Sequence, residues 1–411
     1  MKHISINEER LLERLQELGR TGCEDGKRSR VALSDADKQG RDVVTQWMND
    51  AGLDVRVDRI GNLFGLYGEL SPEGPDPVFI GSHIDSVIDA GMYDGCYGVL
   101  SALEVVQTLK EAGCAPKRPL VVAAFTNEEG VRYAPDMMGS LVYAGGFGID
   151  EALAVIGTDG SVLGEELERI GYAGPEEPGF LKPHAYVELH VEQGPVLDAE
   201  GIQIGAVENL QGISWQRVTI GGVANHAGTT PMRMRKDAGR AAAEVIRFVG
   251  DRADAPGSTS VATVGCIEFE PNAINVIPSR AVFTVDLRNP DDAKMYADEE
   301  ALAGFLEELS RERGVTISTE RLVRFEPVAF DQGIVAKIEA IAKEHGLSVR
   351  RMTSGAGHDA QMMARICPTA MIFVPSKDGI SHNPAEFTPA PDLIAGARVL
   401  LDLIHQLADE E

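Results

Sequence analysis

Pro77-Val78-Phe79-Ile80 and Leu120-Val121-Val122-Ala123-Ala124-Phe125 are short, continuous apolar runs, and the segment between them, Tyr97 to Ala112, has the pattern of a helix ended by Gly113. Apolar runs without alternation are typical of strands covered on both faces. Such strands alternating with helices predict an α/β layer structure whose sheet is mixed and largely parallel. The pattern also predicts strands at Tyr186–His190, Ile202–Val207 and Thr369–Val374, a hairpin from Leu53 to Tyr67, and helices at Asn7–Leu18, Ser34–Ala51 and Leu393–Leu407.

Between about Gln211 and Pro327 the order of elements becomes strand, helix, strand, strand, helix, strand, which is the order of a ferredoxin-like α+β sandwich. Because α/β material resumes after Pro327, this segment is predicted to be an insertion, placed like a lid. We expect a main domain of residues 1–210 and 328–411 and an inserted domain of residues 211–327. The expected elements of the insertion are Trp215–Ile220, Lys236–Gly250, Val261–Phe269, Ala281–Leu287, Asp292–Glu312 and Val315–Phe325.

The composition is that of a soluble globular protein. The 411 residues include 38 Lys plus Arg and 64 Asp plus Glu, a formal net charge of −26, with 44% hydrophobic residues. Because such an acidic surface repels nucleic acid and anionic membranes, we expect neither as a partner. Five scattered cysteines without a CxxC pair predict reduced thiols. The start MKHISINEERLLERLQELG lacks an apolar signal core, and no run of about 18 apolar residues occurs, which together favour a cytoplasmic location.

The densest group of polar residues follows the first apolar run: Gly81-Ser82-His83-Ile84-Asp85-Ser86-Val87, and then Gly91-Met92-Tyr93-Asp94-Gly95. In open α/β sheets, ligands bind beyond the carboxyl ends of the strands. His83 and Asp85 alternate on an extended chain, which suits a metal-bound histidine whose other ring nitrogen is held by a carboxylate. Asp94 lies in a turn between glycines, where its carboxylate can approach two cations. A polar loop with a turn aspartate is the alternative interpretation.

The other strands also end in polar groups. Thr126-Asn127-Glu128-Glu129-Gly130 places adjacent carboxylates after a buried strand, which is unfavourable unless positive charge faces them. A divalent cation would supply that charge and leave one carboxylate for proton transfer; an exposed loop pair is the alternative. His190 ends a further strand, and His382 lies in a loop before the last helix. Nitrogen and oxygen ligands without thiolates suit Zn²⁺, Mn²⁺ or Co²⁺ in a hydrolytic role.

These motifs resemble, in collinear order over nearly the whole chain, those of the amidase, hydantoinase/carbamoylase family within the M20 metallopeptidase clan. The matching strings are GSHIDSV with GMYDG, NEEG, HVEQGP, NHAGTTPM, SGAGHDA and SHNPAE. The resemblance implies a metallopeptidase-like catalytic domain with two divalent ions per subunit (Zn²⁺ or Mn²⁺, with Co²⁺ or Ni²⁺ as further options). It also implies a homodimer formed through the inserted domain. EEGVRY and KRSR depart from the family's EEGSRF-like and GGxTR-like strings, which leaves the substrate's side chain open.

Residue by residue, the resemblance implies one ion held by His83, Asp94 and His190 and a second by Asp94, Glu129 and His382. Glu128 would be the general base and Asp85 the partner of His83. Implied substrate contacts are Gln193, His226, Asn275, Arg288, Gly357 and His358. His226 would donate to the oxyanion across the dimer interface, and the fork of Arg288 suits an α-carboxylate. Without the family match, His226 is equally well explained as a loop cap and Arg288 as a rim ion pair.

The family contains N-carbamoyl-L-amino-acid hydrolases, β-ureidopropionases and allantoate amidohydrolases. We expect hydrolysis of an N-carbamoyl-L-amino acid to the L-amino acid, CO₂ and NH₃, with a small ureido or carbamoyl compound bearing a carboxylate as the substrate. Allantoate hydrolysis is the alternative, followed by a metal-dependent dipeptidase and an inactive relative that binds metal and ligand. Glu128 beside all five expected ligand positions argues against an inactive relative.

Overall fold

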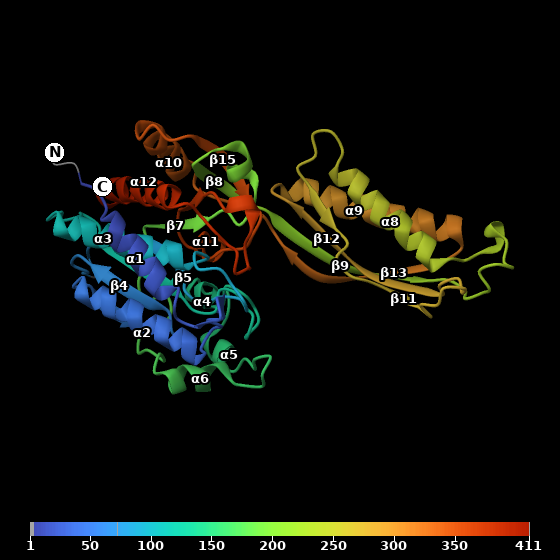
Figure 1. The fold of residues 1–411 in the computed structure, drawn as a ribbon, viewed down its shortest axis with the longest axis horizontal. Helices are drawn as coiled ribbons and strands as arrows, with labels where there is room; N and C mark the ends of the chain where they lie inside the picture. The colour runs from blue at the N-terminus through green and yellow to red at the C-terminus, as the bar shows by residue number, and fades with distance from the viewer. Residues whose placement is uncertain (1–3, 72, 411) are drawn as a thin grey trace. The chain divides into compact units, whose positions relative to one another are not determined.

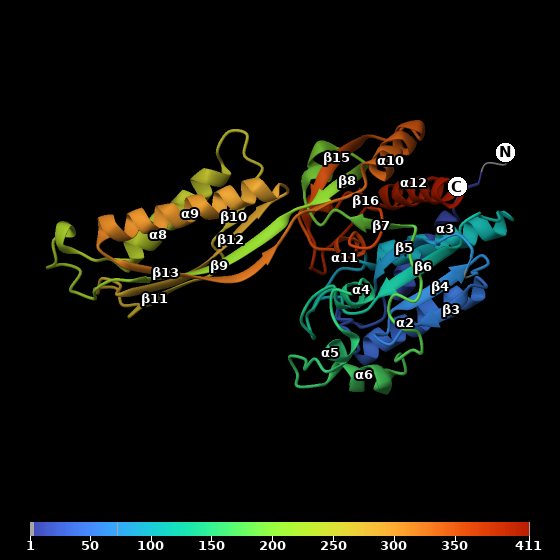
Figure 2. The same ribbon diagram turned by 180° about the vertical axis from the view of Figure 1, so that it is seen from behind.

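The computed structural model describes residues 4–71 and 73–410. The chain forms two compact units, one made of the residues up to Glu208 and from Phe330 onward and the other of Asn209–Ala329. Figures 1 and 2 label their helices and strands from opposite sides. In the part of the chain that the structure describes, no helix has the length and apolar character needed to cross a membrane.

The first unit is built on a nine-stranded sheet with the strand order β14-β8-β16-β7-β5-β6-β4-β3, and β15 pairs with β8. The four central strands, β16, β7, β5 and β6, are parallel to one another, whereas each of the flanking strands β3, β4, β8 and β14 pairs antiparallel with its neighbours in that order. The sheet is therefore mixed, with its parallel part confined to the centre. Its strands are β3 (Asp54–Val57), β4 (Leu63–Tyr67), β5 (Val78–His83), β6 (Leu120–Phe125), β7 (Ala185–Val191), β8 (Ile204–Leu210), β14 (Val328–Ala329), β15 (Val349–Ser354) and β16 (Thr369–Val374).

Every residue of the four central strands is buried, as the continuous apolar runs predict for strands covered on both faces. Helices α3, α11 and α12 contact these strands. Helix α3 packs so closely that a Cβ at Gly98 would lie 2.5 Å from the carbonyl oxygen of Leu189. The helices of this unit are α1 (Glu8–Leu18), α2 (Asp35–Asp50), α3 (Cys96–Glu111), α4 (Met138–Tyr143), α5 (Ile149–Leu153), α6 (Leu163–Ile170), α7 (Val196–Glu200), α10 (Gln332–Glu344), α11 (Asp359–Met363) and α12 (Ala390–Ala408).

The second unit is an antiparallel sheet with the order β10-β12-β9-β13, in which β11 also pairs with β12. Helices α8 and α9 pack on one face, and β12 buries every second residue against them. When β9 is numbered 1, β10 with β11 is numbered 2, β12 is numbered 3 and β13 is numbered 4, the sheet read from β13 has the order 4-1-3-2. This is the order of the predicted ferredoxin-like sandwich. The elements are β9 (Gly212–Gly221), α8 (Ala238–Ala253), β10 (Val261–Thr263), β11 (Ile267–Glu270), β12 (Arg280–Asn289), α9 (Asp292–Arg313) and β13 (Thr316–Phe325).

Two expectations about single elements are wrong in detail. The predicted strand Val261–Phe269 is broken into β10 and β11 at the segment that contains Gly265, and a glycine inside a strand often marks such a break. The strand predicted at residues 77–80 extends through His83, so this histidine belongs to β5 itself. The α2 start at Ser34 is confirmed, because its side chain accepts a hydrogen bond from the amide of Asp37.

Gly81 of β5 gives the first testable prediction. A Cβ at this position would lie 1.9 Å from the carbonyl oxygen of Ala123 in the neighbouring strand β6, which cannot move without breaking the sheet. We expect Gly81→Ala to lower the free energy of unfolding by about 3 kcal/mol or more. Gly250→Ala is the control, because this residue lies in α8 with nothing within 4 Å of the added Cβ. The control should be neutral or stabilising by up to about 1 kcal/mol in denaturant unfolding. Equal effects of the two substitutions would contradict the packing described for β5.

Candidate metal centre

The polar groups predicted from the sequence meet at one edge of the first unit's sheet. The four central strands are parallel, with His83 paired in register with Phe125 and His190 with Phe373, so their carboxyl ends lie side by side. His83 ends β5, Glu128 and Glu129 follow β6, His190 lies near the end of β7, and His382 follows β16. Asp94 lies in the turn before α3, next to Gly95, whose φ of 64° is in the left-handed region.

His83, Asp94 and His190 form the first group of candidate ligands. Oδ1 of Asp94 lies 3.2 Å from Nε2 of His190 and 3.5 Å from Nε2 of His83. The Nδ1 atoms of His83 and His190 contact the carbonyl oxygens of Asp85 and Val191 at 3.0 and 2.8 Å. Because a carbonyl only accepts hydrogen bonds, each Nδ1 carries a proton, and Nε2 is the ring nitrogen that faces Asp94. All three side chains are buried.

Asp94, Glu129 and His382 form the second group. Nε2 of His382 lies 3.2 Å from Oδ2 of Asp94 and 3.5 Å from Oε2 of Glu129. The other oxygen of Glu129, Oε1, accepts a hydrogen bond from the amide of Val87 at 3.2 Å. Asp94 thus presents one carboxylate oxygen to each group. His382 differs from the other histidines because its side chain is 51% exposed and its backbone has a positive φ of 52°.

The chemistry of both groups fits a divalent cation. In each group one potential ligand atom per residue lies within 4.8 Å of the others, and all the donors are imidazole nitrogens or carboxylate oxygens. Burial, followed by the charge of Asp94, raises the pKa of Glu129 to about 8. A buried carboxylate held beside another carries this electrostatic cost until positive charge is supplied between them.

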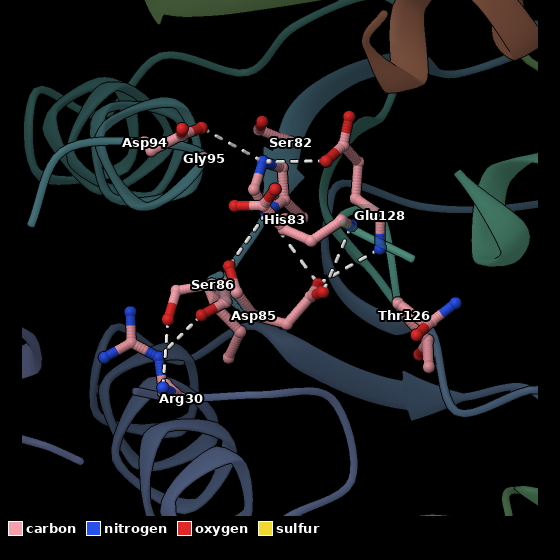
Figure 3. Close-up of polar contacts among 12 residues, drawn as sticks. Arg30, Ser82, His83, Asp85, Ser86, Asp94, Gly95, Thr126 and Glu128 are labelled. Carbon is pink, nitrogen blue, oxygen red and sulfur yellow. Dashed lines mark hydrogen bonds and ion pairs between the residues drawn. The ribbon is translucent and has the colours of Figure 1, made fainter. Parts of the chain in front are cut away.

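Glu128 lies beside the first group as a carboxylate that belongs to neither. Its Oε2 is 3.4 Å from Nε2 of His83, and in Figure 3 it and Asp94 approach this ring from opposite sides. Burial raises the pKa of Glu128 well above its usual range, opposed by the charge of His83 and assisted by those of Asp359 and Glu129. An elevated pKa suits a carboxyl group that takes up and releases a proton near neutral pH.

The carboxylate of Asp85 does not hold the ring of His83. The ring's Nδ1 contacts the backbone oxygen of Asp85 at 3.0 Å, whereas the carboxylate Oδ1 lies 3.7 Å away, beyond hydrogen-bond distance. The carboxylate faces the loop after β6, where it accepts hydrogen bonds from the backbone amides of Glu128, labelled in Figure 3, and Glu129 at 3.2 and 3.3 Å. Each oxygen of the Asp85 carboxylate thus accepts one hydrogen bond from a backbone amide of this loop. Asp85 therefore positions Glu128 and Glu129 together.

This arrangement makes Asp85→Ala a sharp test. Without the carboxylate, the amides of Glu128 and Glu129 lose their acceptor, and the loop that carries both side chains is no longer fixed against β5. We expect kcat to fall by about 10–100-fold. Asp85→Asn keeps one acceptor oxygen and should lose less. Equal activity of wild type and Asp85→Ala in a steady-state assay would show that these two hydrogen bonds have no catalytic role.

A cavity of about 160 Å³ opens onto the two groups. Gln193, Gly357 and His358 line it, together with Asp94, Glu128, Glu129, His382, Ala356 and Asp136. The side-chain Nε2 of Gln193 donates a hydrogen bond to Oδ2 of Asp94 at 2.7 Å. Burial lowers the pKa of His358 well below its usual range, so its imidazole is neutral, and its buried Nε2 has no hydrogen-bond partner among the described residues.

The other three expected substrate contacts lie in the second unit, not in this cavity. His226 and Asn275 are neighbours, since the amide of Ala227 donates to the carbonyl of Asn275 at 2.9 Å, and both are exposed. Arg288 lies near the end of β12, where its guanidinium pairs with Asp286 at 2.9 Å. In register, Arg288 faces Ile213 at one end of β9, whereas Gly221, at the other end of β9, faces Arg280.

Four acidic residues near the site were given no role by the sequence. Glu188 and Asp359 are buried, and Glu188 accepts a hydrogen bond from Ser82 at 2.6 Å and Asp359 one from Ser140 at 2.5 Å. Asp136 lines the cavity, and Glu386 contacts the turn of Asp94. Glu188 carries the one available signal, a charge within the apolar strand β7. The other three lie in loops or at a helix start and leave no such pattern.

A model of the family described as Peptidase family M20/M25/M40 matches residues 79–406. The chain belongs to this family. It is 41% identical to the N-carbamoyl-L-amino-acid amidohydrolase of Rhizobium meliloti, covering 98% of this chain and 97% of the relative, and 37% identical to the allantoate amidohydrolase of Bacillus subtilis (strain 168), covering 88% of each. A solved amidase of the hydantoinase/carbamoylase family from Burkholderia multivorans matches with a TM-score of 0.96 and 41% identity, covering 99% of each chain.

Membership of the M20/M25/M40 family confirms the resemblance drawn from the motifs. The matched region begins in β5 and ends in α12, so it contains both candidate ligand groups as well as Glu128. The similarity to the Burkholderia amidase extends over the whole fold, including the residues of the second unit.

Proposed function

We propose that this M20/M25/M40 family protein is a metal-dependent amidohydrolase that cleaves N-carbamoyl-L-amino acids to the L-amino acid, CO₂ and NH₃. The observation that supports the chemistry best is the pair of ligand groups sharing Asp94, with the buried, uncommitted carboxylate of Glu128 beside them. The substrate class is supported by the 41% and 40% identity, over nearly the full length, to N-carbamoyl-L-amino-acid amidohydrolases of Rhizobium meliloti and Geobacillus stearothermophilus.

Divalent ions, as Zn²⁺ or Mn²⁺, would be held by His83, Asp94 and His190 and by Asp94, Glu129 and His382. When bound, such a pair supplies positive charge that lowers the pKa of water and polarises a carbonyl oxygen. The protein's own part in the reaction begins with Glu128. Its carboxylate takes a proton from the attacking water and returns it to the departing nitrogen, because a carboxyl group within about 3 Å of both atoms serves each direction.

The substrate is positioned by groups of both units. Gln193 and His358 line the cavity, and a neutral His358 is a suitable donor to a developing oxyanion. The guanidinium of Arg288, whose orientation is fixed by Asp286, supplies a planar fork for the α-carboxylate. His226 is proposed as a further donor, with Asn275 beside it.

The second unit supports a homodimeric active site. Arg288 and the His226 loop lie at opposite ends of its sheet, since the eight steps along β12 from Arg280 to Arg288 span about 26 Å at ~3.3 Å per residue. A small carbamoyl amino acid is far shorter than this separation. We therefore propose that the two residues acting on one substrate come from different copies of the chain.

Mixing two inactive variants tests the shared site. His226→Ala and Arg288→Ala should each be inactive as homodimers, whereas a mixed dimer contains one site with both residues intact. After co-refolding or subunit exchange of equal amounts, we expect recovery of about a quarter of wild-type activity, because half of the dimers are mixed and one of their two sites is complete. No recovery, although mixed dimers are detected by native mass spectrometry, would contradict the shared site.

Allantoate is the second candidate substrate, because the chain is 37% identical to the allantoate amidohydrolase of Bacillus subtilis. Ammonia release from N-carbamoyl-L-amino acids, N-carbamoyl-β-alanine and allantoate, and release of free amino acids from a dipeptide, all with Zn²⁺ or Mn²⁺ added, separate the candidates. The proposal predicts the highest kcat/KM for an N-carbamoyl-L-amino acid, with little turnover of its D-enantiomer. A higher value for allantoate would replace the proposed substrate, and no release from any compound would overturn the proposed activity.

A further inference from the structure

Glu386 is a buried carboxylate that directly follows a stretch of exposed residues. It lies four residues after His382 in the connection between β16 and α12, and it is 6% exposed, whereas residues 382–385 are all exposed. Its side chain points away from the solvent into the turn that carries Asp94. The buried carboxylate of Glu386 is called the anchor of this loop, because exposed loop residues usually lack such a contact.

The anchor joins two segments that are far apart in the sequence. Oε1 of Glu386 accepts hydrogen bonds from the amides of Tyr93 at 2.8 Å and Asp94 at 3.4 Å. The turn is shaped around this side chain, because a Cβ at Gly91 would lie 2.3 Å from Cδ of Glu386 and 2.4 Å from its Oε1. The other oxygen, Oε2, is buried with no hydrogen-bond partner in the described part of the chain. A carboxylate retained there, despite an unsatisfied oxygen, is poorly explained by stability alone.

The histidine of the second ligand group is more exposed than the two histidines of the first. His83 and His190 lie on central strands of the sheet, with ring orientations set by backbone carbonyls. His382 is half-exposed on a loop, and Nε2 of Gln193 lies 3.4 Å from its Nε2. The turn of Asp94 keeps a further contact with the first group, since the amide of Gly95 contacts Nε2 of His190 at 3.0 Å.

We propose that Glu386 is a positioning residue that fixes the loop of His382 against the turn of Asp94 and so sets the affinity of the second ion, held by Asp94, Glu129 and His382. This inference rests on the proposed metal centre. Glu386 contacts neither substrate nor ion; it acts through the two segments that it joins. Its loss leaves His83, Asp94 and His190 able to hold one ion, while the second group loses its fixed geometry.

The test is a metal titration of the full-length, chelator-treated protein with Zn²⁺ by calorimetry, with bound metal counted after dialysis. Wild type should bind two ions. Glu386→Ala should bind one ion with wild-type affinity and the second about 10–100-fold more weakly. Glu386→Gln retains an acceptor oxygen and should stay within threefold of wild type at both sites. Gly91→Ala displaces the carboxylate and should reproduce the weakened second site.

Glu104→Ala is the matched control. Glu104 is also buried, and it accepts a hydrogen bond from the backbone amide of Asn7 at 2.8 Å. It joins α1 to α3, away from the ligand groups. This variant should unfold at a lower temperature yet bind both ions as wild type does. Unchanged binding of both ions by Glu386→Ala, or equal weakening of both, would overturn the role of Glu386 alone. Fewer than two ions in wild type would overturn the proposed metal centre, and the inference with it.

Discussion

Glu128→Gln should lower kcat by about 10²–10⁴-fold while the protein keeps its bound metal. The amide has nearly the same shape as the carboxylate but cannot accept the proton of the attacking water. Glu128 belongs to neither ligand group, so both groups remain intact. Because the substitution removes proton transfer rather than binding, KM should change much less than kcat.

Two measurements make this result specific to the base. Metal content, determined by mass spectrometry, should equal that of wild type, and Glu165→Gln, which changes an exposed glutamate of α6, should leave kcat unaltered. A variant that retains both its metal and its turnover would exclude Glu128 as the base. A variant that loses metal would instead show that Glu128 is itself a ligand.

Asp94→Ala should have the largest effect of any single substitution at the site. Asp94 presents Oδ1 to His83 and His190 and Oδ2 to His382, so its removal takes one ligand from each group. We expect loss of both ions and a fall in kcat/KM of at least about 10⁴-fold, out of the 10⁶-fold or more by which enzymes accelerate their reactions. Parallel measurements of metal content and of ammonia release check both parts of the expectation.

The comparison with two other substitutions decides whether Asp94 is shared. His382→Ala removes a ligand from the second group only and should leave one ion bound. Asp136→Asn changes a carboxylate that lines the same cavity but belongs to neither group, so both ions should remain. If Asp94→Ala lost a single ion, as His382→Ala is expected to, the carboxylate would serve one group and not both.

The sequence predicted the architecture well because the decisive signals are local. Continuous apolar runs identified β5 and β6, similar short segments identified β7 and β16, and the order of elements identified the ferredoxin-like unit. The elements that the sequence did not predict correctly are short segments. The break between β10 and β11 rests on the conformation of a few residues around Gly265, and helices α4 and α5, with six and five residues, are too short for a clear helical periodicity.

At the site, the sequence placed the ligand candidates because parallel strands bring their carboxyl ends to one edge. It placed Asp85 beside His83 but did not reveal that the carboxylate accepts the amides of Glu128 and Glu129, since alternation along a strand fixes a direction but not which donors lie nearest. It gave Glu386 no role, because the contact with the turn of Asp94 spans almost 300 residues, as only the fold reveals. The separation of His226 from Arg288 likewise follows from strand register and is invisible in residue spacing.

The most direct test of the account is a crystal structure of the protein grown with Zn²⁺ or Mn²⁺, with anomalous diffraction used to locate the ions. Two peaks are expected about 3.5–4 Å apart, one contacting His83, Asp94 and His190 and the other Asp94, Glu129 and His382. Peaks at other residues, or none at this edge of the sheet in an active preparation, would contradict it.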